Sequence, residues 1–175
     1  MANDTQGLKR FSKKDLQSTF SELSESDRRT LYTFSEISGL ETGEVLMKEG
    51  DPGQTVYLIL EGELKIIKDT NGQPKEITSL RSGDWVGEIA FSKKIPRTAS
   101  AVASVPSSVM AISGTTLNAL NAEAQVFFLK KLNDLANERI SQLVSSEREL
   151  NSLNRRLIDR IHSERSQGEL WVLRP

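Results

Sequence analysis

Residues 84–101 read DWVGEIAFSKKIPRTASA, and this stretch decides how the rest of the chain is interpreted. Gly87 and Glu88 are followed nine residues later by Arg97, with a short polar loop between them. A guanidinium can bind two phosphate oxygens in a fork, which a lysine cannot copy. A carboxylate is a natural acceptor for a ribose hydroxyl, and a glycine lets the backbone approach a ligand closely. The pattern therefore predicts a site for a small, anionic sugar phosphate.

Two short segments of this stretch, residues 86–90 (VGEIA) and 96–100 (PRTAS), resemble the phosphate-binding cassette of the cyclic nucleotide-binding domain. The family pattern is F-G-E-[LI]-A, a short loop, then P-R-[TAS]-A-[ST]. This domain is found in regulatory subunits of cAMP-dependent kinase, in catabolite-activator-type regulators and in cyclic-nucleotide-gated channels. The resemblance extends over about residues 31–113. It departs at Val86, where an aromatic residue is frequent, and at residues 93–94 (KK), where a glycine is often found.

The resemblance implies that the ligand is cAMP or cGMP and that no cofactor or metal is needed. It implies that Arg97 binds the phosphate and that Glu88 holds the ribose 2′-hydroxyl, with backbone N–H groups of the cassette completing the phosphate cradle. The alternative, a surface ion pair between Glu88 and Arg97, would contribute little and would not explain the neighbouring glycine and small residues. The candidate ligand-binding residues are Gly87, Glu88, Ile89, Ala90, Arg97, Thr98 and Ala99.

The choice of base stays open in the sequence. A hydroxyl at the position of Thr98 is common in relatives that prefer cGMP, but it also occurs in relatives that prefer cAMP. We expect cAMP because it is the commoner ligand of stand-alone and bacterial-type domains of this family, and no residue in this sequence decides the choice. In the family a later helix covers the purine, and the candidates at the matching chain distance are Arg139, Ile140, Ser141, Gln142 and Ser145.

Composition limits the other classes of function. The chain has 175 residues, a net charge of −1 and no cysteine, which excludes disulfides and thiolate chemistry and argues against a general affinity for nucleic acid. The start of the chain lacks the apolar stretch of a secretory signal, and the longest apolar run, residues 56–60, is too short to cross a membrane. We expect a cytoplasmic location and no membrane partner.

The order of patterns predicts a mainly β fold with helices at both ends. Residues 1–12 are polar and expected to be mobile, and residues 13–36 have helical spacing with a new helix start near Ser24. Short apolar runs and turn signals over residues 37–113 predict the strands of a β-roll, which the family resemblance specifies as a jelly-roll barrel. Residues 55–60 are apolar on both faces and should form a central strand, residues 69–72 (DTNG) predict a hairpin, and residues 77–80 the strand that follows it. Residues 114–165 read as helices and residues 166–175 as a tail, because the periodicity ends at Gly168.

The C-terminal helix carries leucines at seven-residue intervals: Leu143, Leu150 and Leu157. Ile140, Glu147, Asn154 and Ile161 occupy the partner positions of the heptads, and a single asparagine there is a register device in parallel dimers. This pattern predicts a homodimer that forms through a coiled coil. The alternative is a helix that folds back over its own β-roll.

These features together predict a cyclic nucleotide receptor that transmits binding to its C-terminal helix by a population shift. No nucleophile–base pair, P-loop or metal cluster is evident, His162 reads as a solvated helix residue, and we expect no enzyme activity. The basic residues near the end of the helix are balanced by glutamates, and no helix-turn-helix follows before Pro175, so we expect a protein partner rather than DNA. Two alternatives remain: a ligand-free dimerisation module, and a sensor of another anionic effector.

Overall fold

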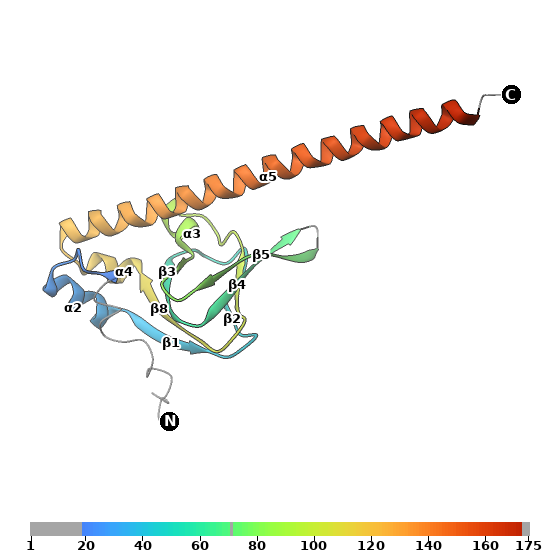
Figure 1. Cartoon of the computed structure of the whole chain (residues 1–175). Helices are drawn as coiled ribbons and strands as arrows, with labels where there is room; N and C mark the ends of the chain where they lie inside the picture. The colour runs from blue at the N-terminus through green and yellow to red at the C-terminus, as the bar shows by residue number, and fades with distance from the viewer. Residues whose placement is uncertain (1–18, 71, 173–175) are drawn as a thin grey trace. The chain divides into compact units, whose positions relative to one another are not determined.

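A computed structural model describes residues 19–70 and 72–172, with side chains up to residue 160. The predicted mobile start, the first turn of the N-terminal helical region, and the side chains of Ile161 and His162 lie outside the described part. Figure 1 shows a β-sheet body with short helices at its edge and a long C-terminal helix. Helix α2 (Glu25–Phe34) begins at the predicted position, because the Ser24 hydroxyl accepts a hydrogen bond from the backbone N–H of Asp27.

The β body consists of two four-stranded sheets within the described residues. In hydrogen-bonded order the first sheet contains β1 (Glu36–Leu40), β8 (Ser107–Ser113), β3 (Thr55–Glu61) and β6 (Trp85–Val86). The second contains β2 (Val45–Met47), β7 (Ser100–Ala103), β4 (Glu63–Thr70) and β5 (Gln73–Arg81). All the strand pairs are antiparallel. The predicted mainly β class is therefore confirmed.

Strand β3 lies inside its sheet, between β8 and β6, as its apolar residues on both faces predict. The hairpin predicted at Gly72 is also present, since Thr70 pairs with Gln73 and Gly72 has a φ of 80°. The strand predicted at residues 77–80 is longer, because β5 pairs with β4 from Gln73 to Arg81. Those extra residues are exposed and, apart from Pro74, polar, so hydrogen bonding to the neighbouring strand holds them and hydrophobic alternation could not identify them.

Two apolar clusters form the core. One lies among strands of both sheets and includes Ile59, Leu64 and Val109, each fully buried. The other joins the first sheet to the helices through three aromatic rings. The Trp85 ring lies edge-on to the Phe128 ring with their centroids 5.6 Å apart, and edge-on to the Phe20 ring at 6.0 Å. Trp85 thus ties the start of the cassette to the helical layer.

After helix α4 (Gly114–Asn118), helix α5 runs from Ala122 to Val172. The sequence predicted an end near residue 165, and this was wrong, because a single interior glycine costs a helix only about 1 kcal/mol and does not stop it. The described chain forms two compact units that divide between Ala136 and Asn137. In the first unit α5 buries Ala124, Phe128 and Leu132 in the core.

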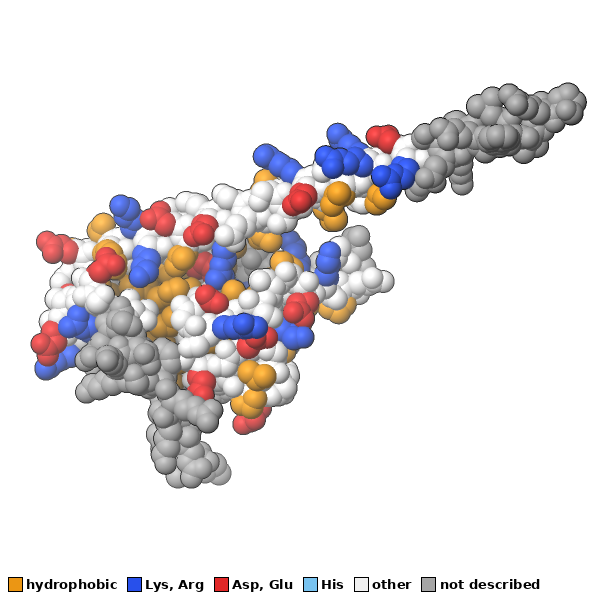
Figure 2. All heavy atoms as spheres, viewed as in Figure 1, with side chains coloured by type: hydrophobic (Ala, Val, Ile, Leu, Met, Phe, Trp, Pro, Cys, Tyr) orange, Lys and Arg blue, Asp and Glu red, His pale blue; other side chains and the backbone are white. Residues whose placement is uncertain are grey.

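The second unit is helical, and its described side chains beyond Ile140 are exposed. Its apolar residues include Leu143, Leu150 and Leu157, between 46% and 55% exposed. Figure 2 shows such apolar side chains at the surface of this helix, interspersed with basic and acidic side chains. Across residues 19–70 and 72–172, no helix combines the length and the apolar character that a membrane span requires.

Candidate functional site

Gly87 stands at the start of the cassette, between strand β6 and helix α3 (Glu88–Lys93). Its φ of 85° lies in the left-handed region, which side chains rarely adopt. A Cβ at Gly87 would also collide with Nη1 of Arg97 and lie 3.3 Å from the carbonyl oxygen of Thr55. Backbone conformation and close packing therefore both require a glycine here.

Arg97 is the buried cation of the site, with only 5% of its surface exposed. Its Nη1 donates to the carbonyl oxygen of Gly87 at 3.2 Å, and its Nη2 donates to the carbonyl oxygen of Thr55 at 2.6 Å. The guanidinium carbon lies 5.6 Å from the centroid of the Tyr57 ring, a cation–π distance. These two hydrogen bonds use two of the five N–H donors that a guanidinium carries. The group is thus fixed in orientation by backbone oxygens and an aromatic face.

The electrostatics of Arg97 reflect its burial. Burial lowers the pKa of Arg97 below its usual value, while Tyr57, Asp51 and Glu88 act in the opposite direction and favour the charged form. Glu88 is itself only 2% exposed. An arginine does not lose its proton in proteins, so this is a desolvated cation beside negative groups. Such a cation attracts an anion more strongly than one at the surface, because water screens it less.

The backbone around Arg97 is fastened to a distant turn. The N–H of Arg97 donates to the carbonyl oxygen of Asp51 at 2.8 Å, and its own carbonyl accepts from the N–H of Gly50 at 2.9 Å. The hydroxyl of Ser100 accepts from the N–H of Glu49 at 3.0 Å. The turn at residues 49–51 therefore fixes the position from which the Arg97 side chain enters the site.

The predicted site residues fall into two groups. Gly87, Glu88 and Arg97 come together in one buried place, as the motif predicts. Ala90 and Ala99 are buried beside them, whereas Ile89 is half-buried and Thr98 is exposed. The candidate purine-covering residues at positions 139–145 belong to the second unit, so their role stays a prediction.

Sequence reasoning missed three participants: Thr55, Tyr57 and Asp51. Thr55 and Asp51 contribute backbone carbonyls, which carry no sequence signature, and Tyr57 lies in a strand whose pattern indicates only a sheet core. The separation of 42 residues between Arg97 and Thr55 is closed by the pairing of β3 with β6 and β8. No signal in a single sequence could have identified them.

The cassette contacts α5 within the first unit. Trp85, two residues before Gly87, packs on Phe128 of α5, and Phe91 of α3 packs against the same cluster. Lys93, the last residue of α3, donates from Nζ to Oδ1 of Asn133 on α5 at 3.3 Å. The strand before the cassette helix and the last residue of that helix therefore both have partners on α5. Among the described residues, no group of three or more histidine, cysteine or acidic side chains could hold a metal ion.

Comparisons with known proteins identify the family. Residues 39–123 match the model of the family described as the cyclic nucleotide-binding domain. The crystal structure of a cyclic nucleotide-binding domain from Methylobacillus flagellatus KT is 31% identical, with a TM-score of 0.63, and the match covers 70% of this chain and 71% of that one. The chain belongs to the cyclic nucleotide-binding domain family, a class of regulatory ligand-binding domains.

Longer regulatory proteins contain similar segments. A cAMP-dependent protein kinase regulatory subunit from Mucor circinelloides f. lusitanicus is 36% identical over 63 residues, which are 36% of this chain and 15% of that protein. A cGMP-dependent protein kinase from Plasmodium berghei (strain Anka) is 28% identical over 119 residues, which are 67% of this chain and 13% of that protein. The chain spans only 15% to 31% of the length of the first curated relatives it matches. The similarity thus concerns one domain of each.

Proposed function

We propose that this chain is a receptor for cyclic nucleotides, with cAMP as the first candidate and cGMP as the second. The observation that carries the proposal is the buried Arg97 guanidinium, oriented beside Gly87 and Glu88 in a chain of this family. The relatives named for cAMP-dependent and cGMP-dependent kinases support both nucleotides.

In this proposal Arg97 binds two oxygens of the cyclic phosphate, because its planar fork matches their spacing. Glu88 accepts a hydrogen bond from the ribose 2′-hydroxyl. The backbone N–H groups of Ile89, Ala90 and Ala99 complete the phosphate cradle, and the absence of a Cβ at Gly87 leaves room for it. Thr98 is exposed, and in this proposal its hydroxyl contacts the ligand.

The effect of ligand binding would be transmitted to α5 through the contacts between the cassette and this helix. A phosphate on Arg97 would bind the same guanidinium that donates to the carbonyl of Gly87, and Gly87 follows directly on Trp85–Val86, whose tryptophan packs on Phe128. A ligand can shift a conformational equilibrium only by its difference in affinity for the two states. We therefore expect the bound and free states to differ in how Trp85 and Lys93 contact α5.

A calorimetric titration with cAMP and then cGMP tests the proposal, after nucleotide carried through purification has been removed. A charge-assisted hydrogen bond contributes about 1.5–3 kcal/mol, and about 1.4 kcal/mol is tenfold in affinity. Arg97→Ala should therefore weaken binding at least tenfold. Arg81→Ala, which removes an arginine whose side chain is 77% exposed, should leave affinity unchanged and serves as the matched control. Full affinity in Arg97→Ala would exclude this site.

The same titration addresses the two alternatives. If neither nucleotide produces heat or stabilises the fold, the nucleotide assignment is wrong. A panel of other phosphorylated effectors then distinguishes the remaining cases. A phosphate that binds through Arg97 indicates a sensor of another anion, and no binding at all indicates a structural module.

We further propose that the second unit pairs with its copy in a homodimer. The exposed leucines at seven-residue intervals, Leu143, Leu150 and Leu157, support a coiled-coil seam. Leu150→Arg should convert a dimer into a monomer in sedimentation velocity. Ser152→Arg adds the same side chain about half a helical turn away and should leave the dimer intact. A wild-type chain that is monomeric at high concentration would contradict this proposal.

A further inference from the structure

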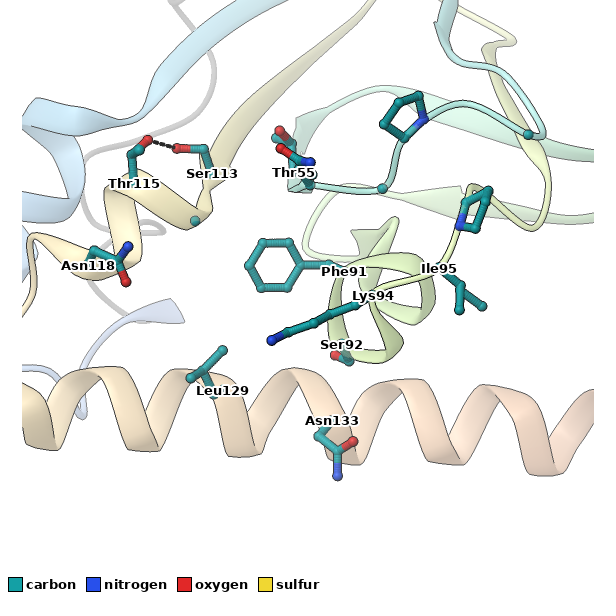
Figure 3. A pocket seen from close by; sticks show the side chains of 16 residues that line it. Thr55, Phe91, Ser92, Lys94, Ile95, Ser113, Thr115, Asn118, Leu129 and Asn133 are labelled. Carbon is teal, nitrogen blue, oxygen red and sulfur yellow. Dashed lines mark hydrogen bonds between the residues drawn. The ribbon is translucent and has the colours of Figure 1, made fainter.

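A second pocket, of about 1080 Å³, lies in the first unit and does not include the proposed phosphate site. Its lining comes from the β2–β3 loop, the end of α3, the start of α4 and the adjacent face of α5 (Figure 3). None of Gly87, Glu88, Arg97, Thr98 or Ala99 lines it. This volume is sufficient for a small organic molecule.

Lys94, at the rim of this pocket, has an unusual backbone. It has a φ of 53° and a ψ of 44°, and among the described residues it is the only non-glycine residue with positive φ. A glycine would adopt this left-handed conformation at the end of α3 without the steric cost that a Cβ imposes. Strained residues of this kind concentrate at functional sites, so the lysine side chain is a candidate for a role of its own.

The side chain of Lys94 extends into the pocket. Figure 3 shows it crossing the space between Phe91 and the α5 residue Leu129. Its ammonium group has no hydrogen bond or ion pair with any residue in the described ranges, whereas the neighbouring Lys93 is bonded to Asn133. Lys94 is an exposed residue, and the pocket thus contains one solvent-accessible cation without a counter-ion among the described residues.

The remaining lining is suited to an amphipathic molecule. Phe91, Ile95 and Leu129 present apolar surface. Asn118 presents an amide, and Ser92 also lines the pocket.

We propose that this pocket binds a small organic monoanion, an aromatic or aliphatic carboxylate, with its carboxylate on Lys94 and its apolar body between Phe91 and Leu129. This second site goes beyond the proposed nucleotide function. The wall of this pocket depends on the glycine at position 53. A Cβ at Gly53 would lie 2.5 Å from the Cβ of Ala90 and 2.6 Å from the carbonyl oxygen of Ile95, so any larger residue would push the loop away from α3.

The pocket is physically connected to the nucleotide site. Thr55 lines the pocket, and its carbonyl oxygen accepts the 2.6 Å hydrogen bond from Arg97. Helix α3 runs from Glu88 to the pocket rim, so both sites contact the same short helix. A carboxylate in the pocket therefore has a route by which it can change nucleotide affinity, and the nucleotide must change carboxylate affinity by the same factor.

The test uses the full chain and 1-naphthoate as the probe, with protein amide resonances followed by NMR. The neutral 1-naphthamide has the same body without the charge. We expect naphthoate to shift the resonances of Asn118 and Leu129 and to bind at least tenfold more tightly than the amide. Lys94→Gly should weaken naphthoate at least tenfold and also raise the melting temperature, because it relieves the left-handed strain. Lys130→Ala removes an exposed lysine that does not line the pocket, and it should change neither the affinity for naphthoate nor the melting temperature.

Each result supports or overturns the proposal. Equal binding of naphthoate to Lys94→Gly and the wild type overturns it, and so does equal binding of naphthoate and naphthamide. Shifts confined to the surroundings of Arg97 show that the probe occupies the nucleotide site, and also overturn it. Because Lys94→Gly is expected to be more stable than the wild type, its loss of binding cannot be attributed to unfolding.

Discussion

Helix α5 has two parts, residues 122–136 and residues 137–160, that both carry regularly spaced apolar residues in sequence but differ in how far those residues are buried. In residues 122–136, Ala124, Phe128, Leu132 and Ala136 recur every four residues and are at most 6% exposed. In residues 137–160, leucines recur every seven residues and are about half exposed. Apolar periodicity thus identifies the helix and its apolar face, but it does not say which surface covers that face.

The reason for the difference is the partner each part has within the chain. Phe128 packs on Trp85 and Phe20, and Leu132 joins the same cluster. The first turn is held as well, because the side-chain oxygen of Asn121 accepts from the N–H of Ala124 at 2.8 Å while Asp27 accepts from both the backbone and the side chain of Asn121. The described side chains that lie beyond residue 140 are all exposed.

Among the changes that test this contrast, Leu132→Ala should lower the free energy of unfolding the most. Leu132 is 1% exposed, and removing a buried leucine side chain costs about 2–5 kcal/mol through lost burial and a cavity. Chemical denaturation followed by tryptophan fluorescence measures the loss. A change under about 0.5 kcal/mol would mean that the first part of α5 is not part of the core.

Asn121→Ala should lower the free energy of unfolding by an intermediate amount. It removes the helix N-cap, which contributes about 1 kcal/mol, and takes from the Asp27 carboxylate, 5% exposed, the hydrogen bond that the Asn121 side chain donates. We expect a loss of about 1–2 kcal/mol in the same denaturation experiment. Asn151→Ala in the exposed part of α5 is the matched control and should be neutral. If Asn121→Ala and Asn151→Ala lower the free energy of unfolding equally, the two parts of α5 do not differ in how they are held.

Leu150→Ala should give the smallest effect on the stability of the β body, within about 0.5 kcal/mol, because Leu150 is already 53% exposed. Its expected effect is on association, seen as a higher dimer dissociation constant in sedimentation equilibrium. Denaturation at low protein concentration separates the two readouts. A loss comparable with that of Leu132→Ala would show that Leu150 is buried within its own chain.

The cassette was largely predictable because its signal is local. Gly87, Glu88 and Arg97 lie within one short stretch, and the structure does bring them together. The central position of β3 and the hairpin at Gly72 also follow from local patterns. Thr55 could not be predicted as a partner of Arg97, because any residue type supplies the same carbonyl oxygen and only strand pairing brings it there.

By itself the sequence determined the elements and the chemistry of one site: an apolar run for a central strand, a helical period for α5, and the Gly87–Glu88–Arg97 motif of the cyclic nucleotide-binding domain family. Only the tertiary structure decided that Arg97 is buried against the carbonyl of Thr55, and that Lys94, three residues earlier, extends into a separate pocket in a left-handed backbone conformation. The physical reason is that hydrophobic period and motif spacing act over a few residues. Burial, strand register and pocket shape depend on contacts between residues far apart in the chain.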